Sequence, residues 1–287
     1  MIAHVAQAGE DRGRVVLQLS SGPSSAIALE AAVRIARAFG SEIESLFIED
    51  QQLFDCAGYA FACEVSLSGR QRRAMTADGI ARDVRSAAQG ARRQIEALAR
   101  KAEVPLHCSV VRDEPLRALS IACARSGPWN VVALAEPFGP AHGSMMKQLL
   151  VEVAGTTGLV VVGPKARRVT GPSIVAVEDI QHLPDLLRAG ERLAALDGAP
   201  VVLLLIAPDE EHLARMEGEA RLVVEAREDV RLERAEVAHG EAAVVAETLR
   251  RLKGGFVICQ YGGLVVPEGG DLRPLAAALE CPLFLVR

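Results

Sequence analysis

The chain has few aromatic residues and no long apolar run, and each shortage excludes a class of protein. Aromatic residues make up only 3% of the 287 positions, which argues against the aromatic surfaces that stack nucleic-acid bases. The longest apolar run, Val201–Ala207, is far shorter than the ~20 residues that a membrane-spanning helix needs. We therefore expect no membrane segment.

The chain also lacks an excess of basic charge and a secretion signal. Its 32 basic and 37 acidic residues give a net charge of -5, which argues against a general nucleic-acid binder. The N-terminal segment carries Glu10 and Asp11 and has no apolar core of the signal-peptide kind. These features predict a cytoplasmic protein whose partners are neither nucleic acid nor membrane.

The six cysteines form no recognisable metal-binding pattern. Cys56 and Cys63 match no common zinc spacing. The other four lie within apolar patterns typical of strands and helices, and a cytoplasmic chain keeps its thiols reduced. We expect neither a metal nor a redox site.

What the sequence does contain is an order of strand and helix patterns that occurs twice. In the first half, strands are expected at residues 15–19, 43–48, 106–111, 131–135 and 159–162, with helices at 25–39, 78–103, 113–125 and 144–154. In the second half, strands are expected at 173–177, 201–206, 230–237, 256–259 and 283–286, with helices at 183–196, 209–226, 241–252 and after Asp271. Gly40 and Gly198, which end the first helix of each half, are 158 positions apart, as are the strand starts Val15 and Ser173. Such an internal repeat is a strong guide to the fold.

The repeat predicts two tandem α/β domains, at residues 1–165 and 172–287. Strands that are apolar throughout are expected where helices cover both faces of a parallel sheet, so each domain is predicted to be a doubly wound, five-stranded sheet. Residues 163–172 have turn residues at both ends and read as a linker. Asp113, Asp209 and Asp271 are predicted helix caps. In such folds a ligand crevice lies at the carboxyl ends of the strands.

Val15–Asp50 resembles the opening of a universal stress protein domain. It has a strand, a polar turn, a helix rich in Ala and Leu that Gly40 closes, and a strand that ends in acidic residues. Ala57–Leu67 is similar to a loop of proteobacterial members. The resemblance covers nearly the whole chain and identifies it as a tandem universal stress protein, related to adenine nucleotide α-hydrolase-like domains. It implies strand order 3-2-1-4-5 and pairing through strand five, in a homodimer or in a pseudo-dimer within one chain.

Many members of that family bind ATP, but the binding signature is degenerate here. Binding members carry an Asp after strand one. After strand four they carry the pattern Gly-x2-Gly-x9-Gly-(Ser/Thr), in which x is any residue. Ser20 and Glu178 stand at the two Asp positions, and Ala135 stands at the first glycine. The loop up to Ser144 is too short, and its prolines remove N–H donors. In the second half the glycines are wrongly spaced, and Asp271 would put a carboxylate where a helix start receives phosphate.

The first-half crevice is the remaining candidate for an anion or nucleotide site, because hydroxyls and free amides at a helix start can hold phosphate. Its residues are Ser20, Ser21, Gly22, Ser24, Gly139, His142, Gly143 and Ser144. In the alternative interpretation Ser24 is only a helix cap and Gly22 part of a turn. The turn also has a faint likeness to the ATP pyrophosphatase loop, but it lacks that loop's glycine at the second position and its Asp. It is also similar to a nucleophile elbow, for which the repeat offers no hydrolase-like sheet.

The predicted helix Arg70–Lys101 is strongly basic. It holds nine basic residues and only Asp78, Asp83 and Glu96 as acidic ones. It is either an ordinary solvated face or a docking surface for an acidic protein partner or for the acidic helix near Glu217 in the second half.

The sequence thus predicts a non-enzymatic stress-response or regulatory protein. It acts through protein contacts and dimerisation, has no cofactor, and binds ATP weakly or not at all. The alternative is a nucleotide-binding protein, slowly hydrolysing ATP, that uses the first-half pocket alone.

Overall fold

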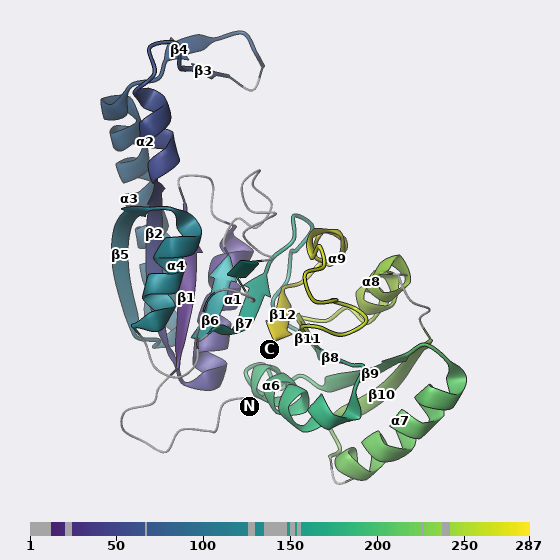
Figure 1. Ribbon diagram of the computed structural model, residues 1–287. Coiled ribbons are helices and arrows are strands. Elements are labelled where there is room, and N and C mark those ends of the chain that lie inside the picture. The colour runs from purple at the N-terminus through teal and green to yellow at the C-terminus, as the bar shows by residue number, and fades with distance from the viewer. Residues whose placement is uncertain are drawn as a thin grey trace.

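The computed structural model describes residues 13–20, 25–66, 68–125, 130–134, 148–149, 153, 156–225, 227–236 and 242–287. Ten strands form one sheet, in the order β10-β9-β8-β11-β12-β7-β6-β1-β2-β5 (Figure 1). These strands are β1 (Arg14–Leu19), β2 (Glu42–Asp50), β5 (Leu106–Asp113), β6 (Asn130–Leu134), β7 (Thr156–Val161), β8 (Ser173–Val177), β9 (Val201–Ala207), β10 (Val230–Glu236), β11 (Phe256–Gln260) and β12 (Leu283–Val286). The mixed α/β fold with a large parallel sheet is the predicted class.

The two halves contribute five strands each, and their spatial order is the same. In each half the third strand lies outermost, followed by the second, first, fourth and fifth. Neighbours within a half are parallel, whereas β7 and β12 pair antiparallel, with Leu159 opposite Leu285. The two fifth strands therefore join both sets into one sheet. The predicted linker, residues 163–172, lies between β7 and β8.

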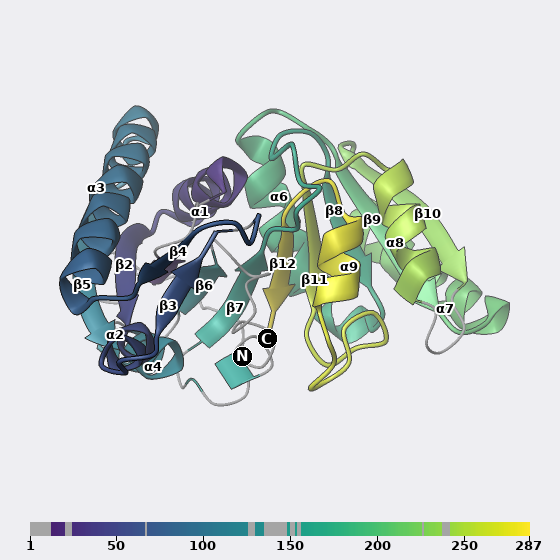
Figure 2. The same cartoon turned by 90° about the horizontal axis from the view of Figure 1, so that it is seen from above.

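Helices cover both faces of this sheet (Figure 2). They are α1 (Ala26–Phe39), α2 (Gln51–Ala57), α3 (Ala77–Ala102), α4 (Pro115–Ala124), α6 (Leu183–Ala195), α7 (Glu210–Val224), α8 (Ala242–Arg251), α9 (Arg273–Ala278) and the 3-10 turn η1 (Ile180–His182). One core packs beneath α1, α3, α6 and α7, and the other beneath α4, α8 and α9. Successive residues of β1 serve both layers, since Val15 and Leu17 belong to the first core and Val16 to the second. This two-sided burial explains the unbroken apolar runs.

Both cores extend across the junction between the halves. The rings of Phe39 in α1 and Phe284 in β12 meet edge to face at 6.1 Å, and the guanidinium of Arg192 lies 5.4 Å from the ring of Phe39. Arg34 of α1 and Asp197 form an ion pair. The halves are therefore packed against each other as well as hydrogen-bonded.

Local signals account for most helix ends. Ser25 caps α1 by accepting the Ala28 N–H at 3.4 Å, and Gly40 ends it with a left-handed φ of 61°. Asp209 caps α7 as predicted, accepting the His212 N–H at 2.8 Å. Two predicted caps are wrong, because Glu114 and Leu272 hold the cap positions of α4 and α9. The Asp113 carboxylate accepts the N–H of Glu114 and lies 3.6 Å from the Arg117 guanidinium, and Asp271 accepts the Arg273 N–H from one residue before the cap position.

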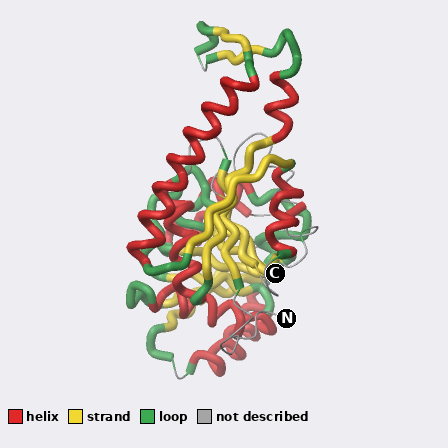
Figure 3. The backbone as a smooth tube through the Cα atoms, turned by 90° about the vertical axis from the view of Figure 1, so that its left-hand side faces the viewer, coloured by secondary structure: helices red, strands yellow, loops and turns green. Residues whose placement is uncertain are grey.

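The stretch between β2 and α3 forms an arm that projects beyond the sheet (Figure 3). We call residues 51–76 the arm; it contains α2 and a hairpin of β3 (Cys63–Val65) and β4 (Arg72–Ala74). α3 begins at Ala77, one residue before the helix predicted at residues 78–103, whereas the predicted basic helix Arg70–Lys101 starts too early, because Arg70, Arg72 and Arg73 belong to the hairpin region. Thr76 caps α3 by accepting the Gly79 N–H at 3.1 Å, which fixes the boundary.

Candidate functional site

Each half places its switch point where the first and fourth strands lie side by side. In the first half these strands are β1 and β6, and in the second half β8 and β11. In doubly wound folds the chain connections leave to opposite sides at such a point, and ligands bind outside the carboxyl ends of the strands there. The carboxyl ends of these two strand pairs are therefore the candidate site regions.

The first-half crevice begins at Ser20 and at the segment that follows β6. Gln18 pairs with Leu134 in the sheet, so both strands end at the same edge. The remaining candidates, Ser21, Gly22, Ser24, Gly139, His142, Gly143 and Ser144, lie outside the described residues. The predicted anion site therefore stays a prediction, framed by Ser20 and by the Ser25-capped start of α1.

The second-half crevice holds a carboxylate of the chain itself. Glu178 directly follows β8, and its two carboxylate oxygens accept the backbone N–H groups of Leu264 and Val265 in the loop after β11. The bond from Val265 measures 3.1 Å. Consecutive amides that converge on one anion form the kind of concavity that binds phosphate in other proteins. Here that place is taken by Glu178.

The glycines of the β11 loop make room for this contact. A Cβ on Gly263 would collide with the Glu178 carboxylate, so the carboxylate packs directly on the bare backbone. Gly262 has a φ of 93° and donates its N–H to the Val266 carbonyl at 2.8 Å, which closes the loop. The spacing of these glycines does not match the phosphate-binding pattern, but it leaves room for the Glu178 side chain.

Burial raises the pKa of Glu178 above its usual value, because a desolvated carboxylate loses the hydration that favours its charge. The two N–H bonds oppose this effect without cancelling it. A partly buried anion with a raised pKa is a poor neighbour for a triphosphate, since two negative charges would share one loop.

Asp271 also places a carboxylate at the start of α9, as predicted. It lies one residue before the cap position, accepts the N–H of Arg273, the first residue of α9, at 3.1 Å, and pairs with the Arg273 guanidinium at 2.7 Å. The sequence did not predict the contact that Glu178 makes with the loop after β11. The length of the side chain could have indicated this contact. Glutamate is one methylene longer than the aspartate that binding members carry at this strand end, so its carboxylate can reach the loop.

Next to Glu178 lies a second polar group. Gln260, at the end of β11, has its amide nitrogen 3.1 Å from Nε2 of His182, and His182 Nδ1 lies 3.5 Å from an Asp179 oxygen. If the Gln260 amide donates to Nε2, Nδ1 carries the proton and faces Asp179. The contact joins η1, which follows β8, to the end of β11.

The described cysteines and acidic residues do not gather into a metal site. Within the described part of the chain, no three His, Cys, Asp or Glu side chains lie close enough to hold a metal ion. Burial raises the pKa of Cys123 to about 11 and that of Cys281 to about 12, so both are protonated thiols near neutral pH. Among the described helices, none combines the length and the apolar character needed to cross a bilayer.

Comparison with known proteins shows which solved structures share this fold. No model of a known family matches the chain, and no curated protein matches it. A universal stress protein from Archaeoglobus fulgidus is 10% identical, with 96% of this chain and 97% of that chain covered and a TM-score of 0.66. The cytoplasmic domain of a prokaryotic cation chloride cotransporter is 9% identical, with 96% and 95% covered and a TM-score of 0.60. A putative universal stress protein from Pseudomonas aeruginosa is 14% identical, with 95% and 92% covered and a TM-score of 0.55. The chain thus has the fold of these universal stress proteins over nearly its full length.

Proposed function

We propose that this chain is a tandem stress-response or regulatory protein of the universal stress protein type. In this proposal it is not an enzyme, it acts through protein contacts, and its ATP signature is degenerate. The observation that carries the proposal is the Glu178 carboxylate on the Leu264 and Val265 amides, which occupies the second-half anion position. The fold supports it, because solved structures of this shape include universal stress proteins and the cytoplasmic domain of a transporter.

We further propose that the two halves act as a pseudo-dimer within one chain. β7 already has β6 and β12 as neighbours, and β12 has β11 and β7. Neither fifth strand has a free edge that could pair with a second chain, which supports a monomer. Native mass spectrometry of the full chain tests this, and a dimer that survives dilution would contradict it.

A second candidate function is nucleotide binding in the first half alone. The observation that favours it is the contrast between strand ends, since β1 is followed by Ser20 where β8 is followed by Glu178. A hydroxyl does not repel phosphate as a carboxylate does.

Thermal unfolding with and without millimolar ATP and magnesium separates the two functions. A ligand present at about 100 times its dissociation constant adds roughly 2.7 kcal/mol to the free energy of unfolding. We expect the wild-type Tm to stay unchanged. A rise in Tm that disappears in Ser144→Asp but persists in Gly263→Ala would establish the second candidate and contradict the first.

A further inference from the structure

The two edge strands of the ten-stranded sheet differ in how they are protected against pairing with a further strand. β10 forms one edge and exposes the charged side chains of Arg231, Glu233 and Arg234, with Arg234 in ion pairs to α7. Charged side chains are a common protection against unwanted strand pairing. β5 forms the other edge. Its exposed His107 and Arg112 lie against Glu42 and Glu49 of β2, while its middle exposes the uncharged Cys108 and Val110, the latter with 59% of its surface accessible. The β5 edge is therefore the open one.

The backbone of β5 offers hydrogen-bonding groups on its outer side. The Ile43 N–H donates to the Pro105 carbonyl at 2.9 Å, so odd-numbered residues turn their backbone groups toward β2. In a parallel ladder the alternate residues then turn theirs outward. Leu106, Cys108 and Val110 thus present N–H and C=O groups at an edge where, in the described part of the chain, no further strand pairs.

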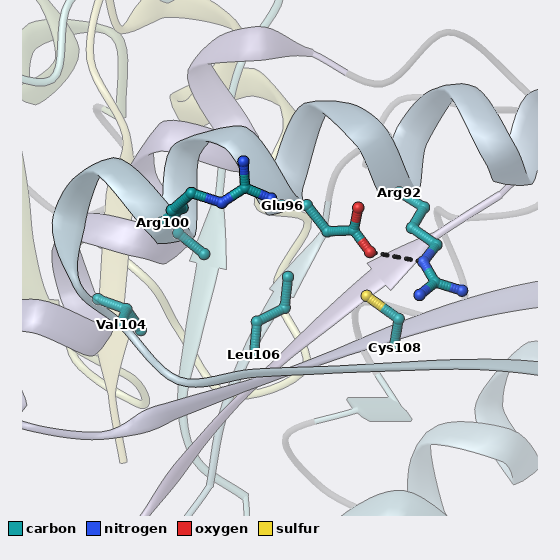
Figure 4. Close-up of a pocket in the computed structure, with 7 residues that line it drawn as sticks. Arg92, Glu96, Arg100, Val104, Leu106 and Cys108 are labelled. Atoms are coloured by element: carbon teal, nitrogen blue, oxygen red, sulfur yellow. Dashed lines mark hydrogen bonds and ion pairs between the residues drawn. The ribbon is translucent and has the colours of Figure 1, made fainter.

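A groove of about 340 Å³ runs beside this edge, between β5 and α3. Figure 4 shows Leu106 and Cys108 of β5 beneath Glu96 and Arg92 of α3, which are joined by a 2.6 Å ion pair. Arg100 lines the same groove. Arg100 forms no ion pair with the described residues, and the same is true of Arg85, which lies seven residues before Arg92 on α3 and outside the residues that line the groove. The groove floor is made by Leu106 and Cys108, and its helix wall carries the Arg92–Glu96 pair and the unpaired positive charge of Arg100.

We propose that the β5 edge is a docking site for an extended, acidic segment of a partner protein. Such a segment would add a strand to β5 through the outward N–H and C=O groups of Cys108 and Val110. Its alternate side chains would lie in the groove, where a carboxylate would meet Arg100, and Arg85 adds positive charge further along the same helix. Charge complementarity of this kind selects the partner and speeds its association.

The charges also argue against a second copy of this chain as the occupant. Two β5 strands related by a twofold axis would bring two α3 helices, with their unpaired arginines, to the same side of the joined sheet. Like charges facing each other oppose such pairing. The acidic helix α7 of the same chain is excluded as well, because α7 covers β9 and β10 at the far end of the sheet, which corrects that predicted alternative.

This proposal rests on the proposed role in protein contacts and names the chemistry of the contact. The two can fail separately. An ATP-dependent rise in Tm would overturn the proposed function without touching the β5 edge, whereas failure of peptide binding would overturn only the docking site.

Fluorescence anisotropy with the full chain tests the site. The probe is a short fluorescent peptide of alternating Val and Glu, and its matched control carries Lys at every Glu position. We expect the Glu peptide to bind at least about tenfold more tightly than the Lys peptide, with affinity falling as salt rises. Equal affinity for both peptides, or binding of neither, would overturn the proposal.

Two variants locate the binding. Val110→Pro removes an outward N–H without touching the ladder to β2, and edge strands tolerate proline there, so we expect the affinity to fall about tenfold. Val110→Thr keeps that N–H and should bind as the wild type does. Arg100→Glu leaves the strand intact and should weaken the Glu peptide while strengthening the Lys peptide. Wild-type binding by both Val110→Pro and Arg100→Glu would place the peptide elsewhere and refute the β5 site.

Discussion

The two halves of the molecule differ most in how they connect their second strand to the next helix. In the second half, only Pro208 and Asp209 lie between β9 and α7. In the first half, the whole arm, residues 51–76, lies between β2 and α3. The strand order of the two halves is nevertheless the same. The sheet therefore does not need the arm, and the arm is an addition to the shared architecture.

The arm is also unlike the sheet in what it exposes. Phe61 has 84% of its surface accessible and Tyr59 58%, and their rings stack on each other at 5.5 Å. Arg73 ties the hairpin to α3, since it pairs with Glu64 in β3 and with Asp83 at 2.9 Å. The halves differ again at the end of the first strand, where Glu178 fills a loop and Ser20 does not supply a carboxylate. Variants in the shared sheet, at Glu178 and in the arm test these differences.

The shared sheet should show the largest effect. Leu17 in β1 is completely buried, so we expect Leu17→Ala to lower the free energy of unfolding by ~2–5 kcal/mol. Because both cores extend across the β7–β12 junction, the whole chain should unfold in one transition at lower urea concentration. Circular dichroism during urea unfolding measures both quantities. Two separate transitions, with only the first half shifted, would show that the halves are energetically independent.

At the end of β8, Glu178→Ala should have the next largest effect. The substitution leaves the amides of Leu264 and Val265 without their acceptor, which costs ~1–3 kcal/mol. Amide hydrogen exchange of these two residues should become faster at the same time. Unchanged exchange would mean that the loop keeps its shape without the carboxylate.

The stability contributed by Glu178 should depend on pH in an unusual direction. Its folded pKa is raised above the unfolded value of about 4.3, so in the interval between them the folded state holds more protons. Its contribution to the free energy of unfolding should therefore fall as pH rises from about 4.3 through the folded pKa. Comparison of urea unfolding of the wild type and Glu178→Gln across this range isolates the contribution. A contribution that grows with pH instead would show that the N–H bonds outweigh burial.

One glycine in α3 and one in α7, the long helices that follow the second strand of each half, allow the same substitution to be compared in both halves. Gly90 in α3 and Gly218 in α7 both have open space where a Cβ would lie. Each Gly→Ala change should raise the free energy of unfolding by ~0.5–1 kcal/mol, because alanine favours the helix. Thermal unfolding of each single variant measures the gain. A gain at one position only would mean that the two helices are not equally well formed.

The sequence carried more information about the sheet than about its additions. Buried strands such as β8 and β12 were predicted to the residue, because continuous apolar runs can be satisfied only between two helical layers. The sequence predicted neither α2 nor the hairpin of the arm, since strands of three residues leave no periodic pattern. The Glu178 contact could not be predicted from the sequence either. It joins residues 86 positions apart, which lie close together only because β8 pairs with β11.

The arm should show the smallest effect on stability. Phe61→Ser removes an aromatic side chain that is almost fully exposed, so we expect the free energy of unfolding to change by less than ~0.5 kcal/mol. Phe47→Ser is the matched control in β2, where the ring is 3% exposed and its loss should unfold or severely destabilise the chain. A loss of more than ~1 kcal/mol for Phe61→Ser would mean that the ring is covered in solution. In that case the arm would be part of the packed structure, and the second half would fold without an element that the first half requires.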